Sequence, residues 1–287
     1  CAIKAYRFAM SQSFIQHWLT YGTPDPGYDL NTYPSKMIGA LVCAMLSYAR
    51  LCPEDAETAM KVAVNAADYL IGITPRGDHP LADLPPTYYL DFCPDPEAYG
   101  VITPNWHAAV AHMGTMMMIY PAVAGSMYVE LEKATGDGKY LEEALKIARY
   151  YQRTVEPNGS WYLVRSCETG EALTTNFVSP LEHVEPFLMG LYERTGEACW
   201  RELAEGAIAY VEKTQLTTYN WEGQFEDVKV SGCYQNLTHF AANEMISYIA
   251  NHLAEDEGMV SEAVDLMRYV EDQFVVWGEF AKWDPNR

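Results

Sequence analysis

The chain repeats one pattern, two helices joined by a short polar turn. The clearest copies lie at 127–155 and 187–215, and looser ones lie at 40–73 and 244–274. In each copy the second helix has apolar residues at i, i+3/i+4 and i+7 with charges opposite, which is typical of a helix with one buried face. The first helix has fewer charges and more small residues, so we expect it to be buried on most sides. The alternation predicts two layers of helices.

Proline and glycine residues mark the helix ends of this repeat. Pro34, Pro121 and Pro180 stand at the starts of first helices, where the missing N–H of proline costs no hydrogen bond. Gly136 and Gly196 follow the ends of two first helices, because glycine readily adopts the left-handed conformation that stops a helix. These signals predict the helix boundaries.

The connections within the pairs and between them differ in length. Turns within pairs are short, whereas connections between pairs run over roughly 74–106, 156–178 and 214–235. In an up-and-down array, this alternation places all the long loops on one face. Binding and catalytic residues are concentrated on loops that a rigid scaffold positions. We therefore expect the functional site on the face that carries the long loops.

Two of the short turns, TGD-x-x-Tyr at 135–140 and TGE-x-x-Trp at 195–200, together with the repeat itself, resemble the (α/α)6-toroid, six-hairpin glycosidase-like superfamily. The resemblance covers nearly the whole chain. It predicts an all-α fold, a single helical toroid domain over 1–287. It also implies that the first helices form the inner ring and that their N-terminal ends surround a central cleft.

The number of helices is smaller than a closed toroid requires. Four pairs and one opening helix over 2–19 give about nine helices, where a closed toroid has twelve. The sequence therefore predicts that a first inner helix and a last pair are missing from this stretch of chain.

Composition narrows the classes of partner. Apolar residues make up 49% of the chain, enough for a sizeable core, and no apolar run approaches the ~18 residues of a membrane span. The formal net charge of −20 repels nucleic acid, so a nucleic-acid partner is not expected. The oligomeric state stays open.

Cysteine usage bears on the compartment. The seven cysteines are scattered without a C-x-x-C pair, which argues against a disulfide framework and against structural zinc. A reducing, cytoplasmic compartment is the expectation. Because the sequence opens on Cys1, a periplasmic or lipid-anchored protein is the alternative.

The loops are rich in aromatic residues, which offer flat surfaces to sugar rings. Five of the seven tryptophans fall in predicted loops. The alternative is that these rings cover the helical core, and that Asn236 caps a helix. The expected substrate-binding residues are Trp106, His107, Trp161, Trp221, Tyr234 and Asn236.

Acidic and histidine side chains cluster near the predicted starts of the inner helices. Hydrolysis of a glycosidic bond uses two carboxyl groups, one protonated and one ionised. His183 and His239 each lie three residues after a proposed helix start, which predicts that both face one cavity. The alternative is that these acidic residues are solvated loop residues, and that Glu182 forms a capping box at the start of its helix. The expected catalytic residues are Asp227, Glu182, His183, His239 and Glu222.

Three functions fit these residues. The first is a glycoside hydrolase acting on a sugar or uronic acid, similar to the unsaturated glucuronyl hydrolases and glucuronidases. The second is a uronic-acid lyase or sugar epimerase, and the third is a non-catalytic glycan-binding protein. The second would use His107, His183, His239, Tyr234, Asn176 and Arg165.

Metal and cofactor sites have no support in the sequence. The acidic residues of 23–34 do not have the spacing of an EF-hand loop, because its glycine and terminal glutamate are missing from the required positions. No phosphate loop, dinucleotide fingerprint or H-E-x-x-H motif is present. We expect neither a metal nor a cofactor.

Overall fold

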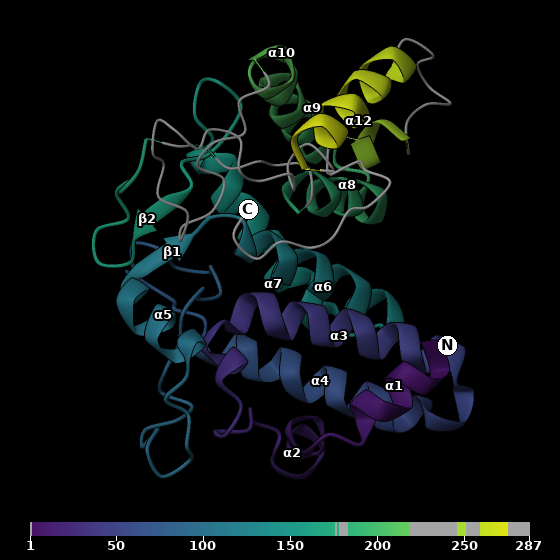
Figure 1. The fold of residues 1–287 in the computed structure, drawn as a ribbon, viewed down its shortest axis with the longest axis vertical. Coiled ribbons are helices and arrows are strands. Elements are labelled where there is room, and N and C mark those ends of the chain that lie inside the picture. Colours follow the sequence, from purple (N-terminus) through teal and green to yellow (C-terminus); the bar gives the residue numbers. More distant parts are fainter. Residues whose placement is uncertain (1, 176, 178–182, 219–245, 251–258, 275–287) are drawn as a thin grey trace, which may run out of the picture.

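The computed structural model describes residues 2–175, 177, 183–218, 246–250 and 259–274. Helices dominate these ranges, and antiparallel helix pairs lie side by side (Figure 1). The paired helices are α3 (Pro34–Leu51) with α4 (Ala56–Ile73), α6 (Tyr120–Thr135) with α7 (Gly138–Thr154), and α8 (Val184–Thr195) with α9 (Ala198–Lys213). The pairs predicted over 40–73, 127–155 and 187–215 are confirmed. Of the fourth copy, the structure describes 246–250 and α12 (Met259–Phe274).

The first helices of the three pairs form the inner layer, because α6 packs against both α3 and α8. Two glycines allow these helices to approach closely. A Cβ atom on Gly39 of α3 would lie 2.7 Å from Val123 of α6, and one on Gly125 of α6 would lie 2.4 Å from the ring of Phe187. Side chains other than hydrogen would push the inner helices apart at both positions.

The short turns have the geometry that their sequences predict. Gly136 and Gly196 end α6 and α8 with φ values of 72° and 74°. Asp137 then caps α7, since its carboxylate accepts a hydrogen bond from the backbone N–H of Lys139. Between α3 and α4 the turn is a 3-10 helix, η2 (Pro53–Asp55).

The opening stretch differs from the single helix expected over 2–19. It forms α1 (Ala2–Met10) and α2 (Ser13–Tyr21), and Gln12 between them has an extended backbone with ψ of 142°. The side chains of Ser11 and Gln12 donate to the carbonyl of Phe8 and so compete with the backbone for the last turn of α1. Local polar side chains, rather than proline or glycine, break this helix.

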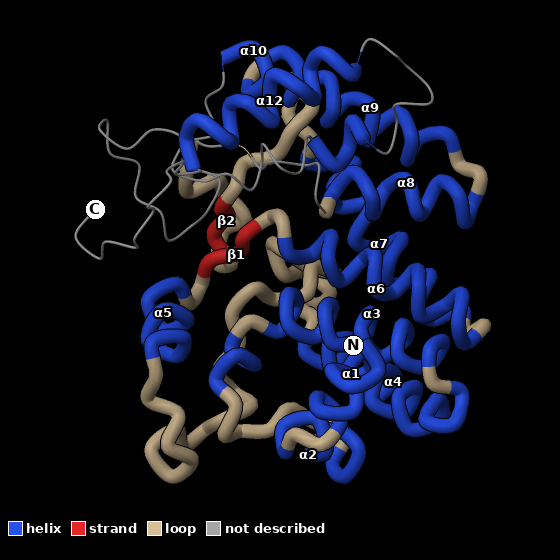
Figure 2. Tube along the Cα trace, turned by 45° about the vertical axis from the view of Figure 1, so that its right-hand side comes forward, coloured by secondary structure: helices blue, strands red, loops and turns tan. Residues whose placement is uncertain are grey.

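The connection expected as a loop over 74–106 also contains structure. Its end forms the start of a short helix, α5 (Pro104–His112), which is followed by the strand β1 (Thr115–Met117). β1 pairs antiparallel with β2 (Val164–Ser166) from the loop after α7, with Met116 opposite Arg165. Figure 2 shows this small sheet beside α5, away from the short turns.

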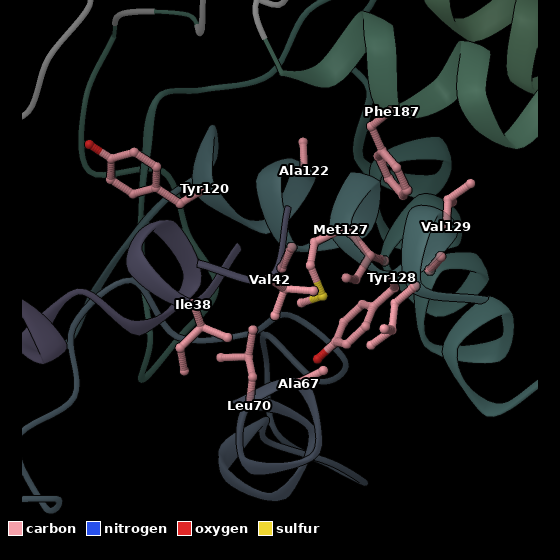
Figure 3. Close-up of a cluster of buried hydrophobic side chains, with 14 of the residues drawn as sticks. Ile38, Val42, Ala67, Leu70, Tyr120, Ala122, Met127, Tyr128, Val129 and Phe187 are labelled. Carbon is pink, nitrogen blue, oxygen red and sulfur yellow. The ribbon is translucent and has the colours of Figure 1, made fainter. Parts of the chain in front are cut away.

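The core lies between the helix layers. Val42 of α3, Leu70 of α4 and Met127 of α6 are fully or almost fully buried, and they face one another in the cluster of Figure 3. None of the described helices has both the length and the apolar character needed to cross a membrane. Each of the five cysteines that the structure describes is a free thiol, as the scattered spacing predicts.

Candidate functional site

Two faces of the helix array can be distinguished (Figure 1). The turn face carries the short turns that join α3 to α4, α6 to α7 and α8 to α9. The loop face carries the N-terminal ends of α3, α6 and α8, together with α5 and the β1–β2 sheet. The long connections that the structure describes therefore gather on one face, as the alternation of loop lengths predicts. Figure 2 shows the same separation from a second side.

An aromatic row on the loop face joins three segments of the chain. Tyr33, which precedes the first residue of α3, meets Tyr88 edge to face at 5.3 Å. The other side of Tyr88 stacks on His112 of α5, with ring centroids 5.6 Å apart and planes 20° from parallel. Tyr88 is 5% exposed, while Tyr33 and His112 are half-buried. The row fixes the end of α5 against the start of α3.

A lysine and a tyrosine pair at the starts of two inner helices. The ammonium group of Lys36, in the first turn of α3, lies 5.4 Å from the ring centroid of Tyr120, the first residue of α6. Lys36 is exposed. Tyr120 is 6% exposed, and Figure 3 shows its side chain at the edge of the buried cluster that holds Val42 and Met127. The ring quadrupole stabilises a cation beside it, and the exposure of Lys36 leaves its ammonium group accessible to a ligand.

The start of α8 supplies a histidine and a carboxylate. His183 is half-buried and precedes the first helical residue, and its backbone carbonyl accepts a bond from the N–H of Phe187. Glu185, in the first turn, is only 6% exposed. A negative charge in the first turn of a helix is favoured by the helix dipole. His183 was expected to lie inside this helix after a start at Pro180, but α8 begins at Val184 instead.

α5 carries two of the expected substrate-binding residues. Trp106 is half-buried and His107 is exposed, and both lie within the helix and not in the loop where the sequence placed them. The hydroxyl of Thr103, at the N-cap, donates to the carboxylate of Asp29 in the 3-10 helix η1 (Asp29–Thr32). This bond ties the start of α5 to the segment before α3.

Trp161 does not have the role expected of it. Its indole is fully buried, meets the Tyr151 ring edge to face at 5.2 Å, and donates from Nε1 to the Tyr151 carbonyl at 2.8 Å. Neither face of the ring can reach a sugar. The alternative weighed for the loop tryptophans, that they cover the core, holds for this residue.

Arg165 was expected to neutralise charge in a lyase or epimerase, but its side chain binds to nearby loop residues. Its side chain is 12% exposed, Nη1 donates to the Gly170 carbonyl at 2.9 Å, and Nη2 lies 3.6 Å from a Glu156 carboxylate oxygen. Its guanidinium holds the loop that follows β2. Lys36 is therefore the more accessible cation of the two.

Several expected site residues lie outside the described residues, and their placement stays a prediction. They are Glu182, Trp221, Glu222, Asp227, Tyr234, Asn236 and His239, together with Asn176. Within the described part, sequence reasoning missed Lys36, Tyr120 and Glu185. The position of all three in the first turn of an inner helix is the signal that identifies them.

The electrostatic environment of the loop face favours protonated phenols. Burial, reinforced by the negative charge of Asp91, raises the pKa of Tyr89, whose backbone N–H bonds to the carbonyl of Thr32 before α3. Its hydroxyl therefore stays a hydrogen-bond donor through the neutral range. The group of potential metal ligands found among the described residues, Cys52, Glu54 and Asp55, lies on the turn face instead.

Comparison with known proteins identifies the fold. No family model and no curated protein sequence matches the chain. Among solved structures, the cellobiose 2-epimerase from Spirochaeta thermophila DSM 6192 matches 94% of this chain and 85% of its own, with a TM-score of 0.50 and 12% sequence identity. At that identity the likeness shows the fold alone. The chain has an all-α, (α/α)6-toroid fold similar to that of this enzyme, as its repeat and turns predict.

Proposed function

We propose that the protein is a carbohydrate-active enzyme whose active site lies on the loop face, and that it moves a proton at the carbon next to a sugar carbonyl, as an epimerase does. The observation that carries the proposal is that Lys36, Tyr120 and His183 stand at the starts of α3, α6 and α8, and that α6 packs against both other helices. The fold shared with a cellobiose 2-epimerase supports the same class of substrate.

The reaction needs a base, an acid and a cation. The base takes the proton from the carbon next to the carbonyl, which leaves an enediolate, and an acid then returns a proton to the opposite face of that carbon. Imidazole is suited to both steps because its pKa lies near neutrality. His183 is the proposed base, and His239, predicted at the start of another inner helix, is the proposed acid.

Lys36 is the proposed stabiliser of the enediolate. A positive charge fixed beside the developing oxyanion lowers the barrier, because it needs no rearrangement when the charge appears. Contact with the Tyr120 ring holds the ammonium group near the start of α6. Aromatic surface for the sugar ring would come from Trp106, which is half-buried in α5.

The second candidate is a glycoside hydrolase, and Glu185 favours it. Its side chain is 6% exposed in the first turn of an inner helix, where a carboxyl group is largely shielded from solvent. Hydrolysis would need a second carboxyl group, for which Asp227 and Glu222 are the candidates.

Solvent deuterium separates the two reactions. Wild-type protein is incubated in D2O with cellobiose, lactose or their monosaccharides, and the products are followed by NMR. The proposal predicts a change of configuration at C2 with one deuterium incorporated there. Release of a monosaccharide without deuterium at C2 supports the hydrolase. A new ultraviolet absorbance from uronic-acid polymers would indicate a lyase and would contradict both.

A further inference from the structure

A recess of about 410 Å³ lies on the turn face, remote from the residues proposed for catalysis. It is bordered by the end of α1, the start of α2, the end of α3 and the start of α4. Recesses of several hundred Å³ are the usual size of small-molecule sites. Polar side chains predominate in its lining, which includes Arg7, Ser11, Gln16, Tyr48, Asp55 and Thr58.

The break between α1 and α2 shapes this recess. The helix is interrupted without proline or glycine at residues 11–12, where side chains add hydrogen bonds to the last carbonyls of α1. Ser11 donates to the Phe8 carbonyl at 2.7 Å, and Gln16 donates to the Met10 carbonyl. Both side chains also line the recess. Ser11 and Gln16 therefore bond to the end of α1 and also line the recess.

The floor of the recess is ordered by buried contacts. Tyr48 is 1% exposed, stacks on Tyr6 with ring centroids 5.3 Å apart, and donates its hydroxyl to Asp55. Burial and this bond keep the phenol neutral, since the hydrogen bond to Asp55 raises the pKa of Tyr48. Asp55 is thereby held at the edge of the recess with its carboxylate oriented.

The charges around the recess disfavour an anion. Arg7 is the one cation among the six polar side chains named above, and its guanidinium already pairs with Glu54 at 2.8 Å and lies 3.8 Å from Asp55. The two carboxylates outnumber it locally, and the whole chain carries −20. A ligand that brings a carboxylate or phosphate would meet net repulsion.

The hydrogen-bonding capacity that remains in the lining instead matches a neutral polyol. Thr58 offers a hydroxyl, Gln16 its amide oxygen and Asp55 its second carboxylate oxygen, while the Ser11 hydroxyl and the Gln16 amide nitrogen already donate to backbone carbonyls of α1. Acceptors beside the apolar side chain of Met10 suit the O–H donors and C–H faces of one sugar ring. We propose that the turn face carries a second, non-catalytic site for a single neutral hexose unit.

The site does not rest on the proposed reaction, and the experiment tests the two separately. Backbone amide signals are recorded in ¹H–¹⁵N NMR during titration with D-glucose, D-galactose or D-mannose, with D-glucuronate as the anionic comparison. At least one neutral hexose should shift signals of residues 7–16 and 52–58. D-glucuronate should bind there more weakly.

Two variants locate the site. Thr58→Trp, which fills the recess from an exposed helical position, should abolish these shifts, and Thr58→Val should weaken binding by about three- to tenfold by removing one hydroxyl. Thr217→Val, at an exposed threonine elsewhere, and His183→Asn should bind as the wild type does. Absence of neutral-hexose shifts in the recess would overturn the proposal, as would unchanged binding by Thr58→Trp or tighter binding of D-glucuronate.

Discussion

The loop face and the turn face are formed by opposite ends of the same helices, yet they use polar side chains differently. On the turn face, polar groups at the ends of α6 and α8 and at the start of α7 bind within the protein. Arg194 at the end of α8 donates two bonds of 2.7 Å to Glu132 at the end of α6, and Asp137 caps the helix that follows. On the loop face, Lys36 is exposed and makes no ion pair with any described residue, and His107 is exposed.

This difference indicates which residues hold the fold together and which are kept for a ligand. The Arg194–Glu132 ion pair and the Asp137 cap stabilise helix ends but have little capacity left for a ligand, unlike the acceptors that line the recess at the start of α4. Removing a cation that interacts with one tyrosine ring should change the free energy of unfolding little. The two faces should therefore respond differently to substitution, stability changing on one and activity on the other.

The largest expected effect belongs to His183 on the loop face. His183→Asn should reduce kcat about 10²–10⁴-fold, because it removes a proton acceptor from the reaction. Its melting temperature should stay close to that of the wild type. The C2 deuterium assay and thermal unfolding measure the two quantities.

The matched control is His17→Asn on α2, where another half-buried histidine bonds to the Thr23 carbonyl at 2.9 Å. That variant should keep full activity. Equal loss of activity in both variants would show that His183 acts only through folding.

The inner layer should be sensitive at Gly125. Gly125→Ala places a Cβ 2.4 Å from the Phe187 ring, and such overpacking costs about 1–3 kcal/mol of unfolding free energy. Gly190→Ala, on α8 with open space around the new atom, should stabilise by about 0.5–1 kcal/mol through helix propensity. Urea denaturation of both variants gives the comparison. Equal stability of the two would contradict the close packing of α6 on α8.

The turn face should lose stability and keep activity when its ion pair is broken. Glu132→Gln should cost about 1.5–3 kcal/mol of unfolding free energy, the range for a hydrogen bond to a charged group. The bonds from Arg194 lower the pKa of Glu132 below its ordinary 4.5. The pair therefore stabilises fully above pH 4.5 and loses its effect as the pH falls through the lowered value.

Urea denaturation at pH 7 and at decreasing acid pH tests this dependence. The difference between the wild type and Glu132→Gln should shrink as the pH falls below 4.5. A difference that stays constant would mean that the carboxylate charge is not what stabilises this pair. Loss of activity without loss of stability would contradict the separation of the two faces.

The smallest expected effect is at Lys36. Lys36→Met should lower kcat about tenfold, equivalent to about 1.4 kcal/mol, because it removes the charge and keeps the stem of the side chain. Stability should hardly change, since the ammonium group forms a cation–π interaction with the Tyr120 ring and no ion pair with a described residue. Lys139→Met, in a turn-face ion pair with Asp68, is the control that should leave kcat unchanged.

The regular part of the fold could be predicted from the sequence because its signals are local. Helix periodicity and the glycines at 136 and 196 fix three pairs and their turns. The break at Gln12 could not be predicted, since it depends on side-chain bonds that a helical sequence can also leave unmade. The short helix α5 was not predicted, because the prolines before it are typical of a loop. A hydrogen bond from Thr103 to Asp29 ties its start to a segment distant in the sequence.

The candidate site was predicted less completely, because a loop residue's burial depends on tertiary packing. Trp161 and Trp106 have similar surroundings in the sequence, yet one lies in the core and the other at the loop face. Glu185 and Lys36 stand out only once the first turns of the inner helices are located. The single toroid domain over 1–287 and the site residues in 219–245 stay predictions.

A crystal structure of the protein soaked with cellobiose or a corresponding monosaccharide tests the central claim most directly, that the loop face binds the reacting sugar. We expect a sugar at the starts of α3, α6 and α8, with hydroxyl or carbonyl oxygens within hydrogen-bond distance of His183 and Lys36. A sugar that occupies only the turn face, or a loop face that stays empty under conditions in which the protein turns over that sugar, would contradict it.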